Sequence, residues 1–395
     1  MSERWLRLVG TTAVTVSTLL VPAPAAAAPD PGTGTAPARQ PDTRPVSELL
    51  TDLQLRYREA ERATEAYNAT TERLKQQQTE VARLDDRLAK ARLALQDSRV
   101  EVGRLARQQY RNSTDLSPYV GLLLARDPEQ AFDQGHLIGQ LARERAESIR
   151  DLTGGAQQAD QLARRARTAL DAQLALSERQ RQARDDVRGQ LEGIEKLLAS
   201  LSPGQLAELA SSEQSGTAAA QQSLVESGAL GTGGAPSSEG DRALRYAVDQ
   251  IGKPYEWGAA GPAAYDCSGL TSRSWERAGR SIPRTSQEQW ARLPHVPLAR
   301  LRPGDLVVYF PEATHVALYL GDGMVVQAPR PGTRVKVSPI AANPILGAVR
   351  PDARASSLRN YEPPRLPRTA LAGSDEGYGT LRPPDTTAPR PGTSP

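Results

Sequence analysis

The chain contains one cysteine, Cys267, among its 395 residues. It stands in the run Asp266-Cys267-Ser268-Gly269-Leu270, upstream of a segment that contains His315. A lone thiol in an exported chain cannot close an internal disulfide, so its presence needs another reason. An isolated cysteine is usually a small core residue, but a cysteine followed by a histidine has the composition of a nucleophile with its base. We therefore predict that Cys267 is a catalytic nucleophile.

Two polar residues are placed to complete such a site. Residues 315–320 and 324–327 have the composition of strands and are joined by Gly321-Asp322-Gly323, which predicts a tight hairpin. An antiparallel hairpin would bring His315 and Gln327 nearly opposite each other on one face. In acyl transfer, His315 would take the thiol proton and pass it to the leaving amine, while Gln327 would orient the imidazole.

The thiol needs a helix to position it. Asp266 can cap a helix whose first turn holds Cys267 and which continues through Leu270 and Trp275. The unpaired N–H groups at a helix N-terminus favour negative charge, so this position should lower the pKa of the thiol. Residues 242–252 have helical spacing and precede this helix, while residues 306–310 predict a further strand.

Four short motifs follow one another between residues 253 and 321: Lys253-Pro254-Tyr255-Glu256-Trp257-Gly258, Asp266-Cys267-Ser268-Gly269-Leu270, Pro303-Gly304-Asp305-Leu306 and His315-Val316-Ala317-Leu318-Tyr319-Leu320-Gly321. In this order they resemble the NlpC-type cysteine peptidases, which are papain-like peptidoglycan hydrolases. The resemblance implies a small α+β domain with an antiparallel sheet, in which Cys267 is the nucleophile, His315 the base and Gln327 the third polar residue. The family often has histidine at the third position, and a glutamine there carries no charge. The resemblance also implies oxyanion or substrate-binding roles for Tyr255, Ser268 and Ser286.

A long helical region precedes this domain. Residues 46–210 predict an antiparallel coiled-coil hairpin, whose first helix runs from about Val46 to Asn112 without a proline. A helix of roughly 65 residues is ~100 Å long at ~1.5 Å per residue. Apolar residues recur every seven positions in both halves. They are Leu74, Val81, Leu88, Leu95 and Val102 in the first helix, then Ile149, Ala156, Ala163, Leu170, Leu191 and Leu198, with Leu152, Ala159, Ala166, Val187, Ile194 and Leu201, in the second. Self-association through the same stripe is the alternative to an internal hairpin.

The tip of the hairpin, residues 113–135, contains an apolar cluster rather than a purely polar turn. Its apolar residues are Tyr119, Leu122, Leu123, Leu124 and Phe132. Exposed apolar clusters often mark binding sites, so we predict that the tip docks a partner, while closure of the hairpin tip is the simpler interpretation. The helical region resembles, in its architecture, that of secreted cell-wall endopeptidases controlled by an FtsEX-type membrane complex. This resemblance implies docking of such a complex through the tip.

The remaining segments are predicted from composition. Residues 1–28 have a positive start, a short apolar run and small residues before Pro29, which indicates a cleaved signal peptide rather than a membrane anchor. Residues 29–45 read as a flexible lead-in, residues 211–240 as a Gly- and Ser-rich linker and residues 353–395 as a disordered Pro-rich tail. The catalytic domain then occupies residues 241–352.

Composition excludes some functions. A net charge of +3 with 24% charged residues is too mild for a nucleic-acid partner, and no cluster of histidine, cysteine and carboxylate predicts a metal or other cofactor. We therefore predict a secreted, cell-wall-associated endopeptidase that cuts peptidoglycan stem peptides. The resemblance implies the bond between D-glutamate and the diamino acid. Because the linker would let the rod fold back over the cleft, we also expect self-inhibition. The alternative is a non-catalytic coiled-coil adaptor that binds wall peptides and regulates other hydrolases.

Overall fold

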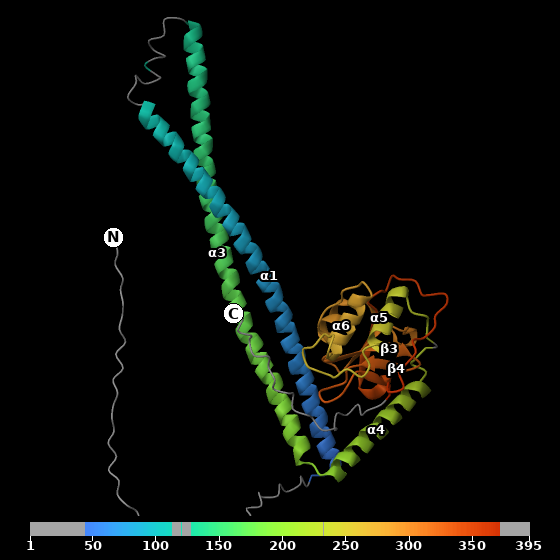
Figure 1. Cartoon of the computed structure of the whole chain (residues 1–395). Helices are drawn as coiled ribbons and strands as arrows, with labels where there is room; N and C mark the ends of the chain where they lie inside the picture. The colour runs from blue at the N-terminus through green and yellow to red at the C-terminus, as the bar shows by residue number, and fades with distance from the viewer. Residues whose placement is uncertain (1–43, 113–119, 121–127, 232, 372–395) are drawn as a thin grey trace, which may run out of the picture. The chain divides into compact units, whose positions relative to one another are not determined.

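The computed structural model describes residues 44–112, 120, 128–231 and 233–371. Its first part is a pair of long helices, α1 (Val46–Asn112) and α3 (Pro128–Ser200), which lie alongside each other (Figure 1). Gln77 donates a hydrogen bond to the carbonyl of Ala169, and Gln180 donates to Thr71, so the helices run antiparallel. The predicted hairpin is confirmed. The signal-peptide, lead-in and most of the tip predictions lie outside the described residues.

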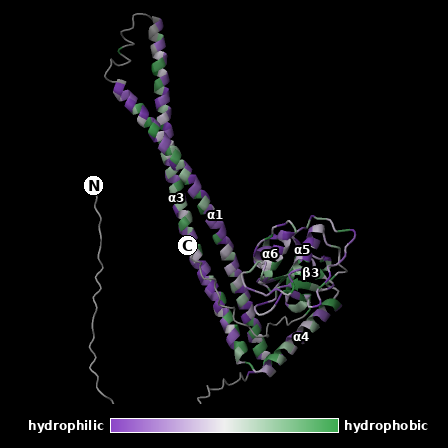
Figure 2. Cartoon of the chain, viewed as in Figure 1, coloured by the Kyte–Doolittle hydropathy of each residue, from purple (hydrophilic) through white to green (hydrophobic). Residues whose placement is uncertain are grey.

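The seam between the helices matches the predicted stripes only in part. In one predicted series, Ala159, Ala166, Val187 and Ile194 of α3 are buried, as is Leu201 just after the helix, while Leu152 is half-buried. Ile149 and Leu170 of the other predicted series are instead 54% and 45% exposed, and Leu162 and Ala169 are buried in their place. A straight helix of ~3.6 residues per turn drifts by ~20° per heptad, so a strict seven-residue count follows the seam for only a few turns. Figure 2 shows how thinly hydrophobic residues are spread along both helices.

The segment after the hairpin is a helix, α4 (Pro203–Glu226), where we predicted a flexible linker from residue 211. The Ser202 hydroxyl caps this helix by accepting a hydrogen bond from Gln205 N–H. In return, the side-chain carbonyl of Gln205 accepts a hydrogen bond from Ser202 N–H. Pro203 suits the first helical turn because its missing N–H would have no partner there. Leu209 is buried with residues of α1 and α3, and Leu224 packs on the sheet of the domain that follows. These apolar contacts stabilise a helix in a segment whose composition indicates a linker.

The α+β domain contains a six-stranded antiparallel sheet in the order β1-β6-β2-β3-β4-β5. The strands are β1 (His295–Val296), β2 (Leu306–Tyr309), β3 (His315–Gly321), β4 (Met324–Gln327), β5 (Lys336–Pro339) and β6 (Ile345–Val349). The helices are α5 (Ser238–Val248), α6 (Cys267–Arg277) and α7 (Ser286–Arg292), with short 3-10 turns η1 (Leu298–Arg300) and η2 (Ile340–Ala342). The sheet confirms the predicted fold class. Sequence patterns identified β2, β3 and β4 but not the other three strands.

The two faces of this sheet carry separate cores. One contains Leu244 of α5 and Trp275 of α6, packed against Val316 and Leu318 of β3. The other contains Tyr309, Val325 and Ile340. The first core places α6, and therefore Cys267, against the strand that carries His315.

The chain after residue 352 continues to pack on the domain as far as Leu371, which corrects the predicted disordered tail over those residues. Ala370 is buried, and its carbonyl accepts a hydrogen bond from Val337 N–H at 2.9 Å. Leu358 N–H likewise donates to the carbonyl of Pro236. Composition cannot reveal such pairing, because it depends on backbone groups of strands elsewhere in the sequence. Among the described residues, no helix is long and apolar enough to cross a membrane.

Candidate active site

Cys267 is the first residue of α6, as predicted. The Asp266 side chain caps this helix by accepting a hydrogen bond from Gly269 N–H at 2.6 Å, and it also accepts from Gly258 N–H at 2.9 Å. Gly269 allows a close approach of the preceding loop, because a Cβ there would collide with the carbonyl oxygen of Ala259. The start of α6 is therefore held rigidly against the loop that precedes it.

His315 and Gln327 meet on one face of the sheet. His315 Nε2 lies 2.8 Å from Gln327 Oε1 across the β3–β4 pair. The register pairs Leu318 with Val326, so the two residues are diagonal neighbours rather than directly opposite. Since Oε1 can only accept, Nε2 carries the proton, and a neutral imidazole then has its lone pair on Nδ1. Nδ1 is thus the atom of His315 that can take a proton.

The thiol lies at the same strand. The backbone of Val316, the residue after His315, forms a hydrogen bond that favours the thiolate of Cys267. Cys267 is 3% exposed and His315 is completely buried. The fold therefore brings the three predicted catalytic residues to one place, but at a site without access to solvent.

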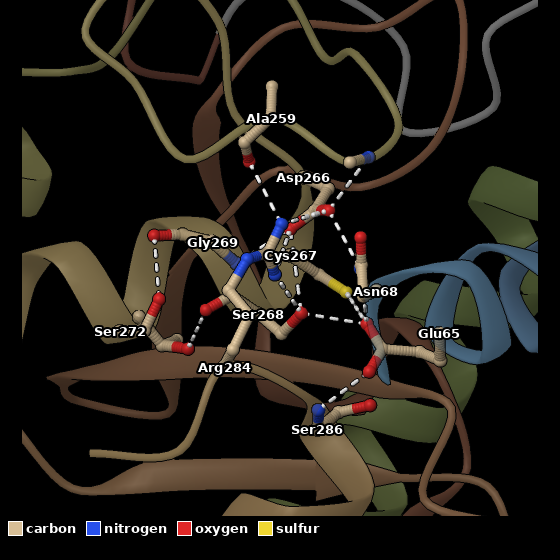
Figure 3. Close-up of polar contacts among 12 residues, drawn as sticks. Glu65, Asn68, Ala259, Asp266, Cys267, Ser268, Gly269, Ser272, Arg284 and Ser286 are labelled. Atoms are coloured by element: carbon tan, nitrogen blue, oxygen red, sulfur yellow. Dashed lines mark hydrogen bonds and ion pairs between the residues drawn. The ribbon is translucent and has the colours of Figure 1, made fainter. Parts of the chain in front are cut away.

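One face of α1 covers this site (Figure 3). Glu65 Oε1 accepts a hydrogen bond from Ser268 Oγ at 2.7 Å and lies 4.0 Å from Cys267 Sγ, while its Oε2 accepts from Ser286 N–H at 2.8 Å. Asn68 donates to Asp266 at 3.0 Å. One turn earlier, Glu61 Oε1 lies 3.4 Å from His315 Nδ1. Side chains of α1 thus occupy the space in front of both Cys267 and His315.

Arg284 supports the same cluster from the domain side. Its guanidinium donates to both carboxylate oxygens of Asp266, at 3.1 and 2.8 Å, and to Ser268 Oγ at 2.8 Å. The Ser268 hydroxyl accepts from Arg284, so its own proton is free to be donated to Glu65. The domain therefore presents two donors, the Ser268 hydroxyl and the Ser286 amide, to a carboxylate (Figure 3).

Burial reverses the predicted ionisation of the thiol. The pKa of Cys267 is raised well above its usual value, first by burial and then by the negative charges of Glu65, Asp266 and Glu61. Burial also lowers the pKa of His315 to about 4. In this arrangement the thiol and the imidazole are both neutral. The predicted low thiol pKa does not apply while α1 covers the site.

The pKa values of the two glutamates of α1, Glu61 and Glu65, are higher than that of a glutamate on the surface. Burial raises the pKa of Glu61 to about 8, and burial together with the charge of Asp266 raises the pKa of Glu65 to about 7. Arg330 opposes the shift of Glu61, and Arg284 that of Glu65. Each of these two carboxyl groups therefore keeps its proton to a higher pH than a surface glutamate.

The sequence profile of the NlpC/P60 family matches residues 252–348, which include Cys267, His315 and Gln327. Residues 252–348 therefore form an NlpC/P60 domain. A probable endopeptidase of Corynebacterium glutamicum is 43% identical over 114 residues, which cover 29% of this chain and 54% of the relative. A probable endopeptidase of Mycobacterium tuberculosis is 38% identical over 114 residues, which cover 28% of this chain and 30% of the relative.

The peptidoglycan endopeptidase RipA of Mycolicibacterium smegmatis is also similar to this chain. It is 36% identical over 126 residues, which cover 27% of this chain and 25% of the relative. The chain thus spans less than two thirds of the length of these curated relatives. Among solved structures, the NlpC/p60 domain of the peptidoglycan hydrolase SagA is 32% identical, with 28% of this chain and 97% of that chain covered and a TM-score of 0.27.

The other predicted site residues differ in their contacts and in how far they are buried. Ser268 and Ser286 both contact Glu65, as described above. Tyr255 is buried, and burial followed by the charge of Cys267 raises its pKa well above the usual value, so its phenol stays protonated. Phe132 at the tip of the hairpin is 76% exposed. The other predicted docking residues, Tyr119, Leu122, Leu123 and Leu124, lie outside the described residues.

Sequence reasoning missed the residues of α1 at this site. Glu61, Glu65 and Asn68 are spaced by four and three residues, which places them on one helical face. Because α1 carries many other charged residues, this spacing does not distinguish residues that contact the site from residues that face solvent. The role of Arg284 was missed as well. Within the described ranges, no three histidine, cysteine or acidic side chains are grouped as metal ligands.

Proposed function

We propose that this protein is an extracytoplasmic cysteine endopeptidase that hydrolyses the stem peptides of peptidoglycan in the cell wall. The observation that carries the proposal is the placement of Cys267 at the start of α6, beside a strand whose His315 is hydrogen-bonded to Gln327. Its NlpC/P60 domain and its similarity to RipA, a peptidoglycan endopeptidase, support the substrate class.

In this proposal each group has a step in acyl transfer. His315 takes the proton of the Cys267 thiol on Nδ1, because Nε2–H is held by Gln327. The sulfur attacks the peptide carbonyl, and the same proton then goes to the leaving amine, which leaves an acyl-enzyme for hydrolysis by water. The protonated phenol of Tyr255 is suited to donate a hydrogen bond to the oxyanion.

The bond proposed for cleavage is the one between D-glutamate and the diamino acid of the stem peptide. Glutamate linked through its γ-carboxyl keeps a free α-carboxylate beside the scissile bond. Ser268 and Ser286 already hold the carboxylate of Glu65 within 4.0 Å of the Cys267 sulfur. This pair of donors supports recognition of a substrate carboxylate at the same place.

The first prediction concerns the nucleophile. A fragment comprising residues 235–371 should release soluble peptides from purified peptidoglycan, and Cys267→Ala should lower the rate to the background, because no other thiol exists in the chain. Mass spectrometry would identify new amino groups on the diamino acid. Ser272→Ala, on the same helix, is the matched control and should keep the wild-type rate. Equal release by Cys267→Ala and the wild type would contradict the assignment and favour the non-catalytic adaptor.

We further infer that α1 inhibits the domain to which it is joined. Glu65 occupies the donor pair of Ser268 and Ser286, Asn68 binds Asp266, and Glu61 faces His315. A substrate cannot reach Cys267 while these contacts persist. The neutral thiol and the low pKa of His315 further oppose formation of the reactive thiolate.

The second prediction tests this inhibition. Glu65→Lys would place a buried cation beside Arg284 and the two donors, which typically costs about 3–5 kcal/mol for an unpaired charge. The full-length variant should therefore digest peptidoglycan at least about tenfold faster than the full-length wild type, since a tenfold change needs only ~1.4 kcal/mol. Glu72→Lys on the same helix is the control. If the full-length wild type already cuts as fast as Glu65→Lys, inhibition by α1 is wrong.

The tip of the hairpin is the proposed docking surface for an activating partner, for which an FtsEX-type membrane complex is our candidate. The exposure of Phe132 supports a binding role for this end of the rod. A partner bound there would act on the end of the hairpin whose first helix, α1, covers Cys267.

A further inference from the structure

The contact between Glu61 and His315 cannot form without a proton. His315 Nε2 donates to Gln327, so Nδ1 of a neutral ring presents a lone pair, and Glu61 Oε1 lies 3.4 Å from it. If the Glu61 carboxylate were ionised, its oxygen lone pair would face the lone pair of Nδ1, and the two would repel each other. Both groups are buried, so water cannot separate them. One proton must therefore lie on Glu61 or on the ring.

We propose that closure of α1 over the active site takes up this proton, which the Glu61 carboxyl holds toward Nδ1 of His315, so that the resting enzyme opens as the pH rises. The proposal rests on the proposed inhibition by α1 and adds to it a dependence on protons. Glu61 is thereby a sensor of pH as well as part of the cover.

The surroundings favour the proton on Glu61 rather than on the ring. Facing Glu61 are Arg58 and Glu65 of α1, Thr314 and His315 at the start of β3, and Arg330 after β4. Cys267, Asp266 and Tyr255, around the start of α6, complete the titratable groups nearby. Arg330 is also shared with other elements, since it stacks on Tyr57 at 4.3 Å and pairs with Glu213 of α4 at 2.9 Å. Burial, with a smaller contribution from the charge of Arg330, lowers the pKa of His315 to about 4. Burial raises the pKa of Glu61 to about 8, although the charge of Arg330 opposes this shift.

The pH window follows from comparing the closed and open states. When α1 leaves, Glu61 returns toward its ordinary pKa of 4.5 and His315 toward 6.5. Between these values the open pair also holds one proton, on the ring, so closure merely moves it to Glu61. Above about 6.5 the open pair holds none, and closure must bind a proton until the pH exceeds the closed-state pKa of about 8. Closure is therefore favoured at and below neutral pH and weakens as the pH rises from about 6.5 to about 8.

Glu65 acts in the same direction at lower pH. Its pKa of about 7 in the closed state exceeds its ordinary value of 4.5, so closure also favours its protonated form up to about pH 7. The hydrogen bonds that Glu65 accepts from Ser268 and Ser286, and the charge of Arg284, partly offset this effect. The test must therefore separate Glu61 from Glu65.

Alkylation of Cys267 in the full chain provides the test, because it is the only thiol. The rate with iodoacetamide is measured from pH 6.5 to 9 and divided, at each pH, by the rate of the full-length Glu65→Lys variant as an open reference. Division removes the intrinsic titration of the thiol, so the ratio gives the open fraction. For the wild type, the ratio should rise about tenfold or more over this range.

Glu61→Gln is the decisive variant. Its amide N–H can donate to Nδ1 at every pH, so closure needs no proton at this position. The ratio should stay low and change by about fivefold or less, which is the part that Glu65 contributes above pH 6.5. Glu59→Gln, two residues earlier on α1, should behave as the wild type. Circular dichroism would verify that each variant keeps its helices. Asn68→Lys serves as a second open reference if Glu65→Lys does not fold.

The outcomes distinguish inhibition by α1 from the dependence of that inhibition on a proton. A wild-type ratio near one throughout would overturn inhibition by α1 and, with it, the proton dependence. A ratio that is low but constant with pH would leave inhibition intact and overturn proton uptake. A Glu61→Gln variant with the wild-type slope would overturn the assignment of the proton to Glu61.

Discussion

Two opposing effects act on the thiol of Cys267, and their sizes decide its state. A helix N-terminus stabilises a negative charge by about 0.3–1 kcal/mol, which lowers a pKa by less than about one unit. Full burial can raise the pKa of an acid by as much as about 3–5 units. Burial therefore prevails while Glu65 and Asn68 cover the site, and the pKa of Cys267 rises. Once α1 departs, the helix N-terminus and the Val316 hydrogen bond should favour the thiolate again.

The neutrality of Gln327 leads to the fourth prediction. Gln327→Glu would place a carboxylate 2.8 Å from Nε2 of His315, where it stabilises the imidazolium. In a Glu65→Lys background, which removes the cover, the pKa of His315 should rise by about 1–2 units. An NMR titration of the imidazole resonances would measure this. Gln222→Glu, an exposed site on α4, should leave that pKa unchanged, and an equal shift in both variants would refute a direct contact.

At the scale of elements, the catalytic domain depends on segments outside the predicted boundaries. Residues 353–371 add a backbone hydrogen bond from Val337 to Ala370 and bury the Ala370 side chain. Arg302, which is buried, binds both the Asp352 carboxylate and the carbonyl of Ala355. The domain is therefore larger than its sequence motifs indicate.

The fifth prediction follows from these contacts. Truncation of the 235–371 fragment after Asp352 should lower its stability by about 1–2 kcal/mol, because each lost hydrogen bond contributes about 0.5–1.5 kcal/mol. For a domain of this size, the Tm should fall by roughly 5 °C or more, measured by differential scanning calorimetry. A fragment ending at Leu371 is the reference. Identical melting of the two fragments would show that the tail contributes nothing to the fold.

At the scale of the whole chain, the proposed inhibition by α1 would need only a weak interface. The contacts between α1 and the domain include the Arg62–Glu312 ion pair, which is exposed, and the edge-to-face pair of Tyr67 and Trp257. Exposed ion pairs contribute about 0–1 kcal/mol and aromatic pairs about 0.5–1.5 kcal/mol. Because both partners belong to one chain, the effective concentration is in the mM range, and modest contacts suffice for closure. A cover held this weakly can be released by a partner or by the loss of one proton.

The order of motifs was sufficient to predict the candidate catalytic residues and the elements that carry them. Asp266 is the predicted helix cap, Cys267 is the predicted nucleophile in the first turn, and the spacing of His315 and Gln327 around a tight turn predicts their contact. These signals are local, because capping and hairpin geometry depend on residues close together in sequence. The proline-free run from Val46 to Asn112 likewise predicted the full length of α1.

Only the tertiary structure revealed that the site is covered. Glu61 and Glu65 are ordinary residues of a charged helix, and they lie more than 200 positions from the groups they contact. Burial by a distant segment decides the pKa of Cys267, the helicity of α4 and the ordering of the chain up to Leu371. Sequence thus determined which residues can perform the chemistry. Desolvation, which depends on what packs in front of them, decided that this resting arrangement keeps them neutral.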